Sequence, residues 1–205
     1  MKKSYVIVLT GGIASGKSTV AKYISSKGYE IIDSDELVHE VYRSDIELIA
    51  RIKAAFGELV IKDNKIDRNI LMNEVIEDDD KLKMLNSIVH LRIVELLIKK
   101  VNESDDKIIF LDIPLMFEVK EFLDKHELVY DEIWYVYLDK NQQIDRLKKR
   151  AIEEGKNVDH VIKIISKQMS SEIKKKLADE IIDNTGNLEN TYKHIERLLE
   201  RLNER

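Results

Sequence analysis

Residues 5–19 read YVIVLTGGIASGKST, and this stretch decides the fold class. The apolar run Tyr5–Leu9 is typical of a fully buried strand. Gly11 and Gly16 enclose four residues and are followed by Lys17 and Ser18, which fits the phosphate-loop pattern G-x-x-x-x-G-K-[ST]. Glycine tolerates positive φ, so backbone N–H groups can turn toward an anion at the amino end of the following helix. The stretch predicts a strand, a phosphate-binding loop and a helix; the alternative is a glycine-rich turn that only joins the two elements.

Strand and helix patterns alternate along the rest of the chain. Short runs rich in Val and Ile predict further strands over 30–32, 108–111, 132–138 and 180–182. Periodicity near 3.6 residues predicts helices over 17–27, 36–56, 68–76, 81–101, 142–153, 159–177 and a closing stripe over 188–202. Continuous apolar strands that alternate with helices indicate an α/β fold with a doubly wound, five-stranded parallel sheet.

The 205 residues are expected to form a single domain with two additions. The long stretch between the second and third strands predicts a helical insertion over about 36–104. An irregular stretch around 151–160 predicts a mobile lid, within a lid region of about 150–177. The sheet core is then made of residues 1–35, 105–150 and 178–205.

Composition narrows the classes of function. The 34 Lys and Arg against 39 Asp and Glu give a formal net charge of −5, which argues against a general nucleic-acid binder. The absence of cysteine excludes disulfides, cysteine metal sites and a thiol nucleophile. No stretch has the length of apolar sequence that spans a membrane, and no targeting segment is visible, so we expect a cytoplasmic protein.

Acidic residues follow two of the predicted strands. Asp33 and Asp35 come at the end of the second strand, and Asp112 follows the third. The carboxyl ends of parallel strands form the ligand-binding edge of such sheets, so we expect these carboxylates near the phosphate loop. Asp33 could orient an attacking hydroxyl, and Asp112 could contact Mg²⁺ through water. The alternatives are helix capping by Ser34 or Asp35 and a simple turn at Asp112.

Arg146 and Arg150 are four residues apart and share one face of a predicted helix. A guanidinium pair on that face could neutralise charge on a transferring phosphoryl group. The alternative is a solvated arginine face, which the spacing alone favours. A second basic run, Lys174–Lys176, is expected to be solvent-exposed.

Together these positions resemble the dephospho-CoA kinase family. Residues 9–19 resemble that family's LTGGIGSGKST, with Ala14 where a glycine is usual. Residues 32–35 resemble its IDAD, and 112–118 resemble D-x-PLLFE. Residues 143–150 resemble Q-x-x-RL-x-x-R, and 178–186 resemble AD-x-VIDN-x-G. Residues 67–90 resemble the segment that runs into a His-Pro pair, although Leu91 stands at the proline position. The resemblance extends over almost the whole chain in order.

The resemblance implies a P-loop kinase that transfers a phosphoryl group from MgATP to the 3′-hydroxyl of dephospho-CoA and forms coenzyme A and ADP. It implies Asp33, Lys17 and Arg150 as catalytic residues and Ser18 as a ligand of Mg²⁺. The residues implied for ATP are Gly11, Gly12, Ile13, Ala14, Ser15, Gly16, Lys17, Ser18, Thr19, Arg146, Arg150 and Asn184. The residues implied for dephospho-CoA are Thr10, Asp33, Asp35, Arg68, His90, Asp112, Pro114 and Leu115.

Two other functions fit parts of the pattern. A nucleoside or nucleoside-monophosphate kinase would share the phosphate loop, and a slow nucleotide-hydrolysing switch would need no acceptor subdomain. The expected partners are ATP and dephospho-CoA, and no binding to nucleic acid or membrane is expected. The expected oligomeric state is a monomer or a weak homo-oligomer.

Overall fold

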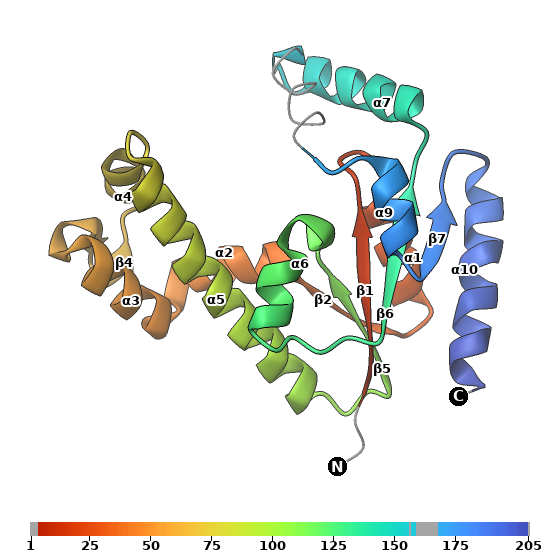
Figure 1. The fold of residues 1–205 in the computed structure, drawn as a ribbon, viewed down its shortest axis with the longest axis horizontal. Helices are drawn as coiled ribbons and strands as arrows, with labels where there is room; N and C mark the ends of the chain where they lie inside the picture. Colours follow the sequence, from red (N-terminus) through yellow and green to blue (C-terminus); the bar gives the residue numbers. More distant parts are fainter. Residues whose placement is uncertain (1–3, 156, 159–167, 205) are drawn as a thin grey trace. The chain divides into compact units, whose positions relative to one another are not determined.

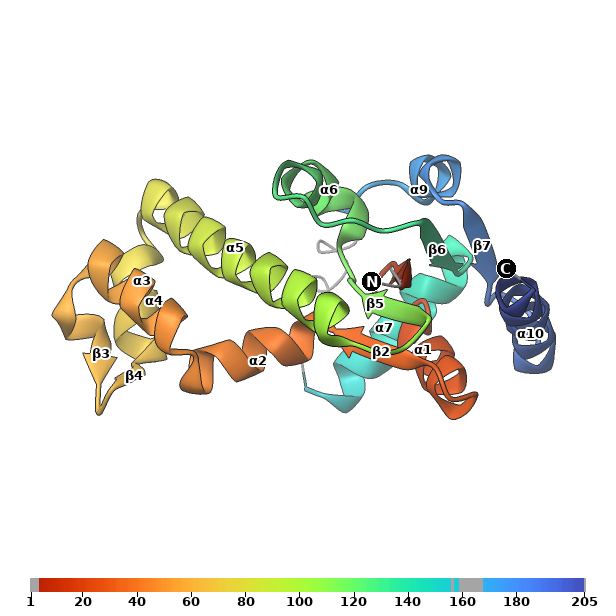
Figure 2. The same ribbon diagram turned by 90° about the horizontal axis from the view of Figure 1, so that it is seen from below.

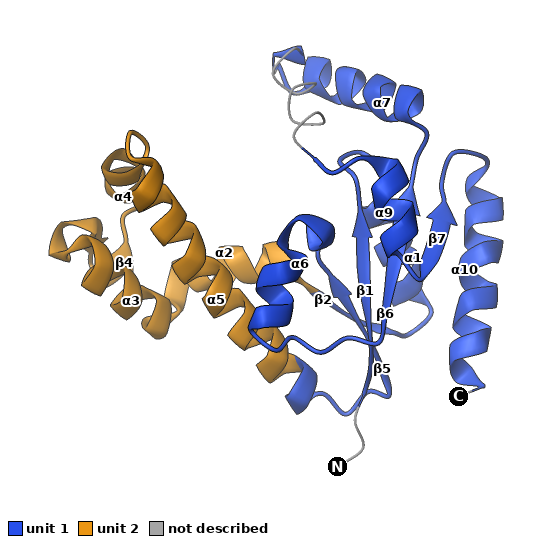
Figure 3. Cartoon of the chain, viewed as in Figure 1, with its two compact units in different colours: residues 1–32, 101–205 blue, residues 33–100 orange. Residues whose placement is uncertain are grey.

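The computed structural model describes residues 4–155, 157–158 and 168–204. It divides the chain into two compact units (Figure 3). Unit 1 comprises residues 1–32 and 101–205, and unit 2 comprises residues 33–100. The part of the expected lid at residues 156 and 159–167 lies outside the described residues.

Unit 1 is built on a five-stranded sheet, drawn as arrows in Figure 1. Its strands are β1 (Tyr5–Gly11), β2 (Glu30–Asp33), β5 (Ile108–Asp112), β6 (Glu132–Tyr137) and β7 (Glu180–Asp183). Their spatial order is β2-β5-β1-β6-β7, and the sheet is entirely parallel. The predicted α/β fold with five parallel strands is therefore confirmed, and each strand lies within two residues of its predicted bounds.

Helices cover both faces of this sheet, as the view in Figure 2 shows. They are α1 (Lys17–Ser26), α6 (Met116–Lys125), α9 (Ser171–Leu177) and α10 (Leu188–Asn203). Helix α7 (Lys140–Glu153) lies beyond the carboxyl ends of the strands in Figure 1. Helices α1 and α10 pack together over one face, where Val20, Ile24 and Ile195 are fully buried. Helix α6 was not predicted, because the sequence from Asp112 to Glu118 reads as a turn and the helix starts inside it.

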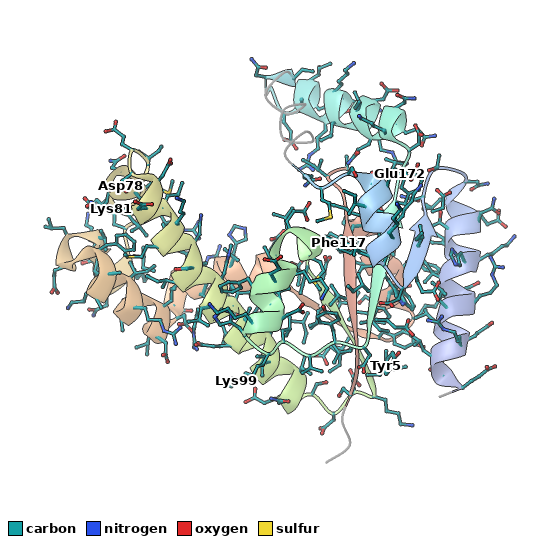
Figure 4. All side chains as sticks on the ribbon, in the orientation of Figure 1. Tyr5, Asp78, Lys81, Lys99, Phe117 and Glu172 are labelled. Atoms are coloured by element: carbon teal, nitrogen blue, oxygen red, sulfur yellow. The ribbon has the colours of Figure 1, made fainter. Side chains whose placement is uncertain are left out.

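Alternating side chains of β6 divide the core between the two faces of the sheet. Trp134 is fully buried on the face of α1 and α10, where its ring meets Phe110 edge-on at 5.1 Å and its Nε1 donates to Glu132 Oε2 at 2.9 Å. On the opposite face, Tyr135 meets Phe117 of α6 edge-on at 5.8 Å (Phe117 is labelled in Figure 4). The sheet is thus buried on both sides, as its continuous apolar strands require.

Unit 2 is mainly helical. It contains α2 (Ser34–Ser44), α3 (Ile46–Phe56), a 3₁₀ turn (Glu58–Val60), β3 (Ile61–Lys62), β4 (Lys65–Ile66), α4 (Arg68–Val75) and most of α5 (Asp79–Glu103). The single helix predicted over 36–56 is wrong, because Asp45 adopts an extended conformation and its side chain accepts from the N–H of Leu48, which caps a new helix. The hairpin β3–β4 was also missed; its turn residues Asp63 and Asn64 both have positive φ.

A network of charged side chains holds α3 to α5 within unit 2. Arg92 of α5 donates to both carboxylate oxygens of Asp45, at 2.9 and 2.8 Å. Arg51 of α3 donates to both oxygens of Glu95 of α5, at 2.8 and 3.0 Å. Burial tends to raise the pKa of Asp45, but the hydrogen bonds from Arg92 and Leu48 outweigh it and lower that pKa overall.

Candidate functional site

The predicted phosphate loop lies between β1 and α1, at the carboxyl edge of the central strand. The N–H of Ser15 donates to the carbonyl of Gly12 at 3.0 Å and closes a tight turn. Gly16 takes φ +90° at the start of α1, a conformation that favours glycine. Ala14 also takes a positive φ of +59°, which explains why a glycine is usual at this position in the family's motif.

Lys17 extends from the first turn of α1 and forms an ion pair with Asp112, the last residue of β5. The Asp112 carboxylate is almost completely buried, and the Lys17 amine is mostly so. Both residues were predicted for the site, and the structure brings them together at the edge where β1 and β5 end. A charged pair at this depth is strongly oriented, because desolvation makes any alternative placement of either charge costly.

The predicted residues around this pair differ in exposure. Thr10 is buried and its hydroxyl donates to the carbonyl of Pro114 at 3.1 Å, so it holds the chain after β5. Leu115, the next residue, is exposed. Thr10 therefore holds the backbone beside the candidate site, whereas Leu115 lies at the surface.

The side-chain amides of three residues form hydrogen bonds with backbone groups of the loop. Gln143 of α7 donates from Nε2 to the carbonyl of Ile13 at 2.7 Å, and Oε1 of Gln168 accepts from the Ile13 N–H at 3.4 Å. Asn184, directly after β7, donates from Nδ2 to the carbonyl of Ser15 at 2.8 Å. Only Asn184 of these three was predicted as an ATP-site residue. Neither the motif that contains Gln143 nor the sequence around Gln168 indicates their shared partner Ile13, which is more than 100 residues away in the chain.

The two predicted arginines of α7 differ in their surroundings. A Cβ added to Gly16 would lie 3.4 Å from Arg146 Nη1, so the Arg146 guanidinium lies beside the loop. The Arg150 side chain is 63% exposed and its Nε donates to Glu154 one turn later at 2.7 Å. Arg146 thus borders the phosphate loop in this structure, and Arg150 is oriented by its own helix.

Asp33 ends β2 and is the N-cap of α2. Its Oδ1 accepts from the N–H groups of Asp35 and Glu36, at 2.7 and 3.2 Å. The alternative considered from the sequence, capping by Ser34 or Asp35, is therefore wrong, because Asp33 itself caps the helix. Because both capping bonds go to Oδ1, the cap fixes the direction of the carboxylate while Oδ2 takes no part in it.

Unit 2 contains the other residues predicted for the acceptor. The Arg68 guanidinium lies 4.4 Å from the centre of the Tyr42 ring, a cation–π contact that links α4 to α2. His90 and Asp35 are exposed residues of α5 and α2.

Lys174 contradicts the expectation of a solvent-exposed run at Lys174–Lys176. It is 2% exposed and pairs with Glu118 of α6 at 2.7 Å. The same carboxylate accepts from the N–H of Met169 at 3.1 Å. Periodic charge on a short helix does not reveal such a long-range partner, so α9 is joined to α6 by a buried charge that the sequence pattern concealed.

The described part of the chain contains neither a cluster of metal-ligating side chains nor a membrane-spanning helix. Among the described residues, no group of three or more His, Asp or Glu side chains could hold a metal ion. No helix in the described part of the chain is long and apolar enough to cross a bilayer.

Comparison with known proteins agrees with this geometry. The family model for dephospho-CoA kinase matches residues 5–190. A dephospho-CoA kinase of Carboxydothermus hydrogenoformans is 38% identical over 200 residues, which cover 96% of this chain and 93% of that protein. The corresponding protein of Fusobacterium nucleatum is 35% identical over 198 residues, covering 95% and 97%.

Solved structures show the same fold. The protein TT1252 of Thermus thermophilus superposes with a TM-score of 0.75 at 30% identity, covering 98% of this chain and 99% of that one. A dephospho-CoA kinase from Campylobacter jejuni gives 0.66 at 24% identity, covering 96% of each chain. A shikimate kinase from Acinetobacter baumannii gives 0.54 at 14% identity, which indicates the common P-loop kinase fold. The chain belongs to the dephospho-CoA kinase family, whose members are kinases that phosphorylate dephospho-CoA with ATP in coenzyme A biosynthesis.

Proposed function

We propose that this chain transfers the γ-phosphoryl group of ATP to the 3′-hydroxyl of the ribose of dephospho-CoA. The new bond joins the 3′-oxygen to phosphorus, the bond to the bridging oxygen breaks, and ADP leaves. The observation that carries the proposal is the loop between β1 and α1 with Lys17 on Asp112, in a chain that matches the family over residues 5–190. Phosphoryl transfer depends mainly on positioning and charge stabilisation, which such a loop supplies.

Asp33 is proposed to receive the proton of the 3′-hydroxyl. It ends β2, and β5 with its terminal Asp112 is the neighbouring strand, so the two carboxylates follow adjacent strands. Its cap on α2 leaves one carboxylate oxygen for the hydroxyl. A carboxylate held in this way orients the nucleophile and accepts its proton as the bond to phosphorus forms.

Lys17, Arg146 and Arg150 are proposed to stabilise charge on the transferred group. Lys17 would exchange part of its contact with Asp112 for the phosphates, and Arg146 already lies beside Gly16. Arg150 would leave Glu154 when substrates bind, which costs little because the pair is exposed. Arg68 and His90 of unit 2 are proposed to contact dephospho-CoA.

The chemistry of the donor set fits Mg²⁺. Ser18 offers a hydroxyl in the first turn of α1, and Asp112 offers a carboxylate. Mg²⁺ in kinases is held mostly by nucleotide phosphates and water, with one or two protein oxygens, so a site of few acidic side chains is sufficient. The ion would neutralise charge on the phosphates when bound.

The test is ADP formation from MgATP with dephospho-CoA, compared with adenosine, AMP, CMP and no acceptor, with products identified by mass. The proposal is supported if, of these acceptors, only dephospho-CoA reacts and its product is coenzyme A. The 2′-deoxy and 3′-deoxy forms of dephospho-CoA assign the hydroxyl: the 2′-deoxy form should react and the 3′-deoxy form should not. Turnover with another acceptor would indicate a different kinase, and equal turnover without acceptor would indicate a nucleotide switch.

The metal is tested separately. Chelation should abolish activity and added Mg²⁺ should restore it. Ser18→Ala should raise the Mg²⁺ concentration required for half-maximal rate, whereas an unchanged requirement would remove Ser18 from the metal site.

A further inference from the structure

Two peptide groups of the phosphate loop are held by buried side-chain amides. Gln143 donates to the carbonyl of Ile13, and Asn184 donates to the carbonyl of Ser15. Gln143 is 7% exposed and Asn184 is 4% exposed. The Thr191 hydroxyl lies 3.1 Å from the carbonyl of Asp183 and 3.3 Å from Asn184 Oδ1, and the carbonyl of Ser15, which can only accept, requires the NH2 end of the amide on the loop side.

Peptide planarity makes these contacts directional. In a trans peptide the C=O of one residue and the N–H of the next point in opposite directions. A partner on the carbonyl of Ile13 therefore directs the N–H of Ala14 away from Gln143. A partner on the carbonyl of Ser15 likewise directs the N–H of Gly16 away from Asn184. Within the described ranges, neither N–H has an acceptor.

The glycines of the loop make room for these amides. A Cβ on Gly12 would lie 2.8 Å from Gln143 Nε2, although Gly12 does not have a positive φ. A Cβ on Gly16 would lie 2.2 Å from Asn184 Nδ2. Both distances are shorter than a normal van der Waals contact. A Cβ on Gly12 would therefore displace the Gln143 amide, and a Cβ on Gly16 would displace the Asn184 amide and also strain the backbone.

We propose that Gln143 and Asn184 are positioning residues that turn the N–H groups of Ala14 and Gly16 toward the terminal phosphate of a bound nucleoside diphosphate. The inference rests on the proposed function for the identity of the nucleotide. Neutral amides orient the loop without adding negative charge near the phosphates, which an aspartate or glutamate in the same place would do.

The first test compares Gln143→Met with Gln142→Met. Methionine keeps the length of the side chain and removes the amide, and Gln142 is the exposed neighbour on the same helix. Calorimetric titration should show ADP binding weakened roughly five- to tenfold in Gln143→Met, the ratio that corresponds to one net hydrogen bond. Gln142→Met should bind ADP as the wild type does.

The preference for ADP over AMP separates positioning from general damage to the site. Misdirected loop N–H groups should weaken ADP more than AMP, so the ratio of the two dissociation constants should fall in Gln143→Met. A variant that is merely destabilised should lose affinity for both nucleotides in proportion. The inference is overturned if ADP affinity stays within about twofold of the wild type or if the ratio does not change.

Asn184 gives a second test that does not depend on Gln143. Asn184→Asp keeps the size and the acceptor for Thr191 but replaces the donor to Ser15 with a carboxylate oxygen. Its ADP affinity should fall at least as much as that of Gln143→Met, while Asn190→Asp on the exposed part of α10 should have no effect. Normal ADP binding by Asn184→Asp would overturn its role.

These binding measurements are independent of the acceptor. A wild-type chain that binds ADP but makes no coenzyme A would contradict the proposed function and leave the positioning role supported by the variants. A wild-type chain that makes coenzyme A, with Gln143→Met binding ADP normally, would contradict the positioning role alone.

Discussion

Gly16→Ala should destabilise unit 1 more than Gly28→Ala, although the two glycines have nearly the same backbone φ. Gly16 has φ +90° and Gly28 has φ +89°. A Cβ at Gly16 would meet the Asn184 amide at 2.2 Å, whereas a Cβ at Gly28 has no heavy atom within 4 Å among the described residues. The pair separates the cost of the neighbour from the cost of the backbone conformation.

The expected magnitudes follow from these two terms. Placing an alanine in the left-handed region lowers the free energy of unfolding by about 1–2 kcal/mol. Alanine also restricts the unfolded chain more than glycine does, which raises the free energy of unfolding by about 0.4–1 kcal/mol. Gly28→Ala should therefore lower the free energy of unfolding by about 1 kcal/mol. Gly16→Ala adds a clash with a buried amide that is hydrogen-bonded to Ser15 and Thr191, and overpacking of this kind costs about 1–3 kcal/mol more.

The assay is equilibrium unfolding in urea, followed by far-UV circular dichroism for both variants and the wild type. Asn184→Ala and the double variant Gly16→Ala/Asn184→Ala complete a cycle. Removing the amide should relieve the clash, so the double variant should be more stable than the sum of the single effects predicts, by about 1–3 kcal/mol.

Two results would refute the reasoning. Equal destabilisation by Gly16→Ala and Gly28→Ala, within about 0.5 kcal/mol, would mean that no amide lies against Gly16. Additive single effects in the cycle would mean that any extra cost at Gly16 comes from elsewhere.

Three further predictions concern charges. Lys17→Ala should lower kcat at least about 10²-fold, the scale of one lost preorganised donor. The control is Lys22→Ala, at an exposed position of the same helix, which should leave kcat unchanged. Near-normal turnover of Lys17→Ala in steady-state assays would exclude Lys17 from catalysis. Asp33→Asn should keep the cap on α2 and the thermal midpoint of unfolding, since asparagine caps a helix as well as aspartate does. Its kcat should fall while its affinity for ATP stays unchanged. A lower affinity for ATP with a normal kcat would contradict this prediction. Asp45→Asn should lower the free energy of unfolding at neutral pH, and this loss should shrink as the pH falls below about 4. The pKa of Asp45 is lowered in the folded state, so its charge stabilises the fold above the unfolded pKa, and this stabilisation disappears as the pH falls through the folded pKa. Urea titrations at several pH values check this, and a loss independent of pH would argue against the ion pair with Arg92.

The sheet of this chain was predictable because its strands are continuous apolar runs that follow or precede clear turns. The errors lie where one polar residue outweighs a helical pattern. Asp45 divides the helix predicted over 36–56, because its carboxylate caps α3 and binds Arg92, which the local pattern does not reveal. The hairpin at 61–66 was missed because its strands have two residues each and their turn has no glycine.

The placement of the candidate site residues was predictable where it depends on local sequence. The loop motif predicted Lys17 at the start of a helix after a strand, and the apolar run before Asp112 predicted this residue at a strand end. The contacts of Gln143 with Ile13 and of Lys174 with Glu118 join residues far apart in sequence, so neither periodicity nor spacing could identify them.

Trp134 is the one tryptophan of the chain, and it lies in the core of unit 1 on the face shared by α1 and α10. Its ring contacts Phe110 and its Nε1 is bonded to Glu132, so its emission is a built-in optical reporter of that core. Residues 33–100 contain no tryptophan and are silent in the same signal. Coincident fluorescence and dichroism transitions would mean that the two units unfold as one cooperative system, whereas a dichroism change without a fluorescence change would reveal unit 2 melting first.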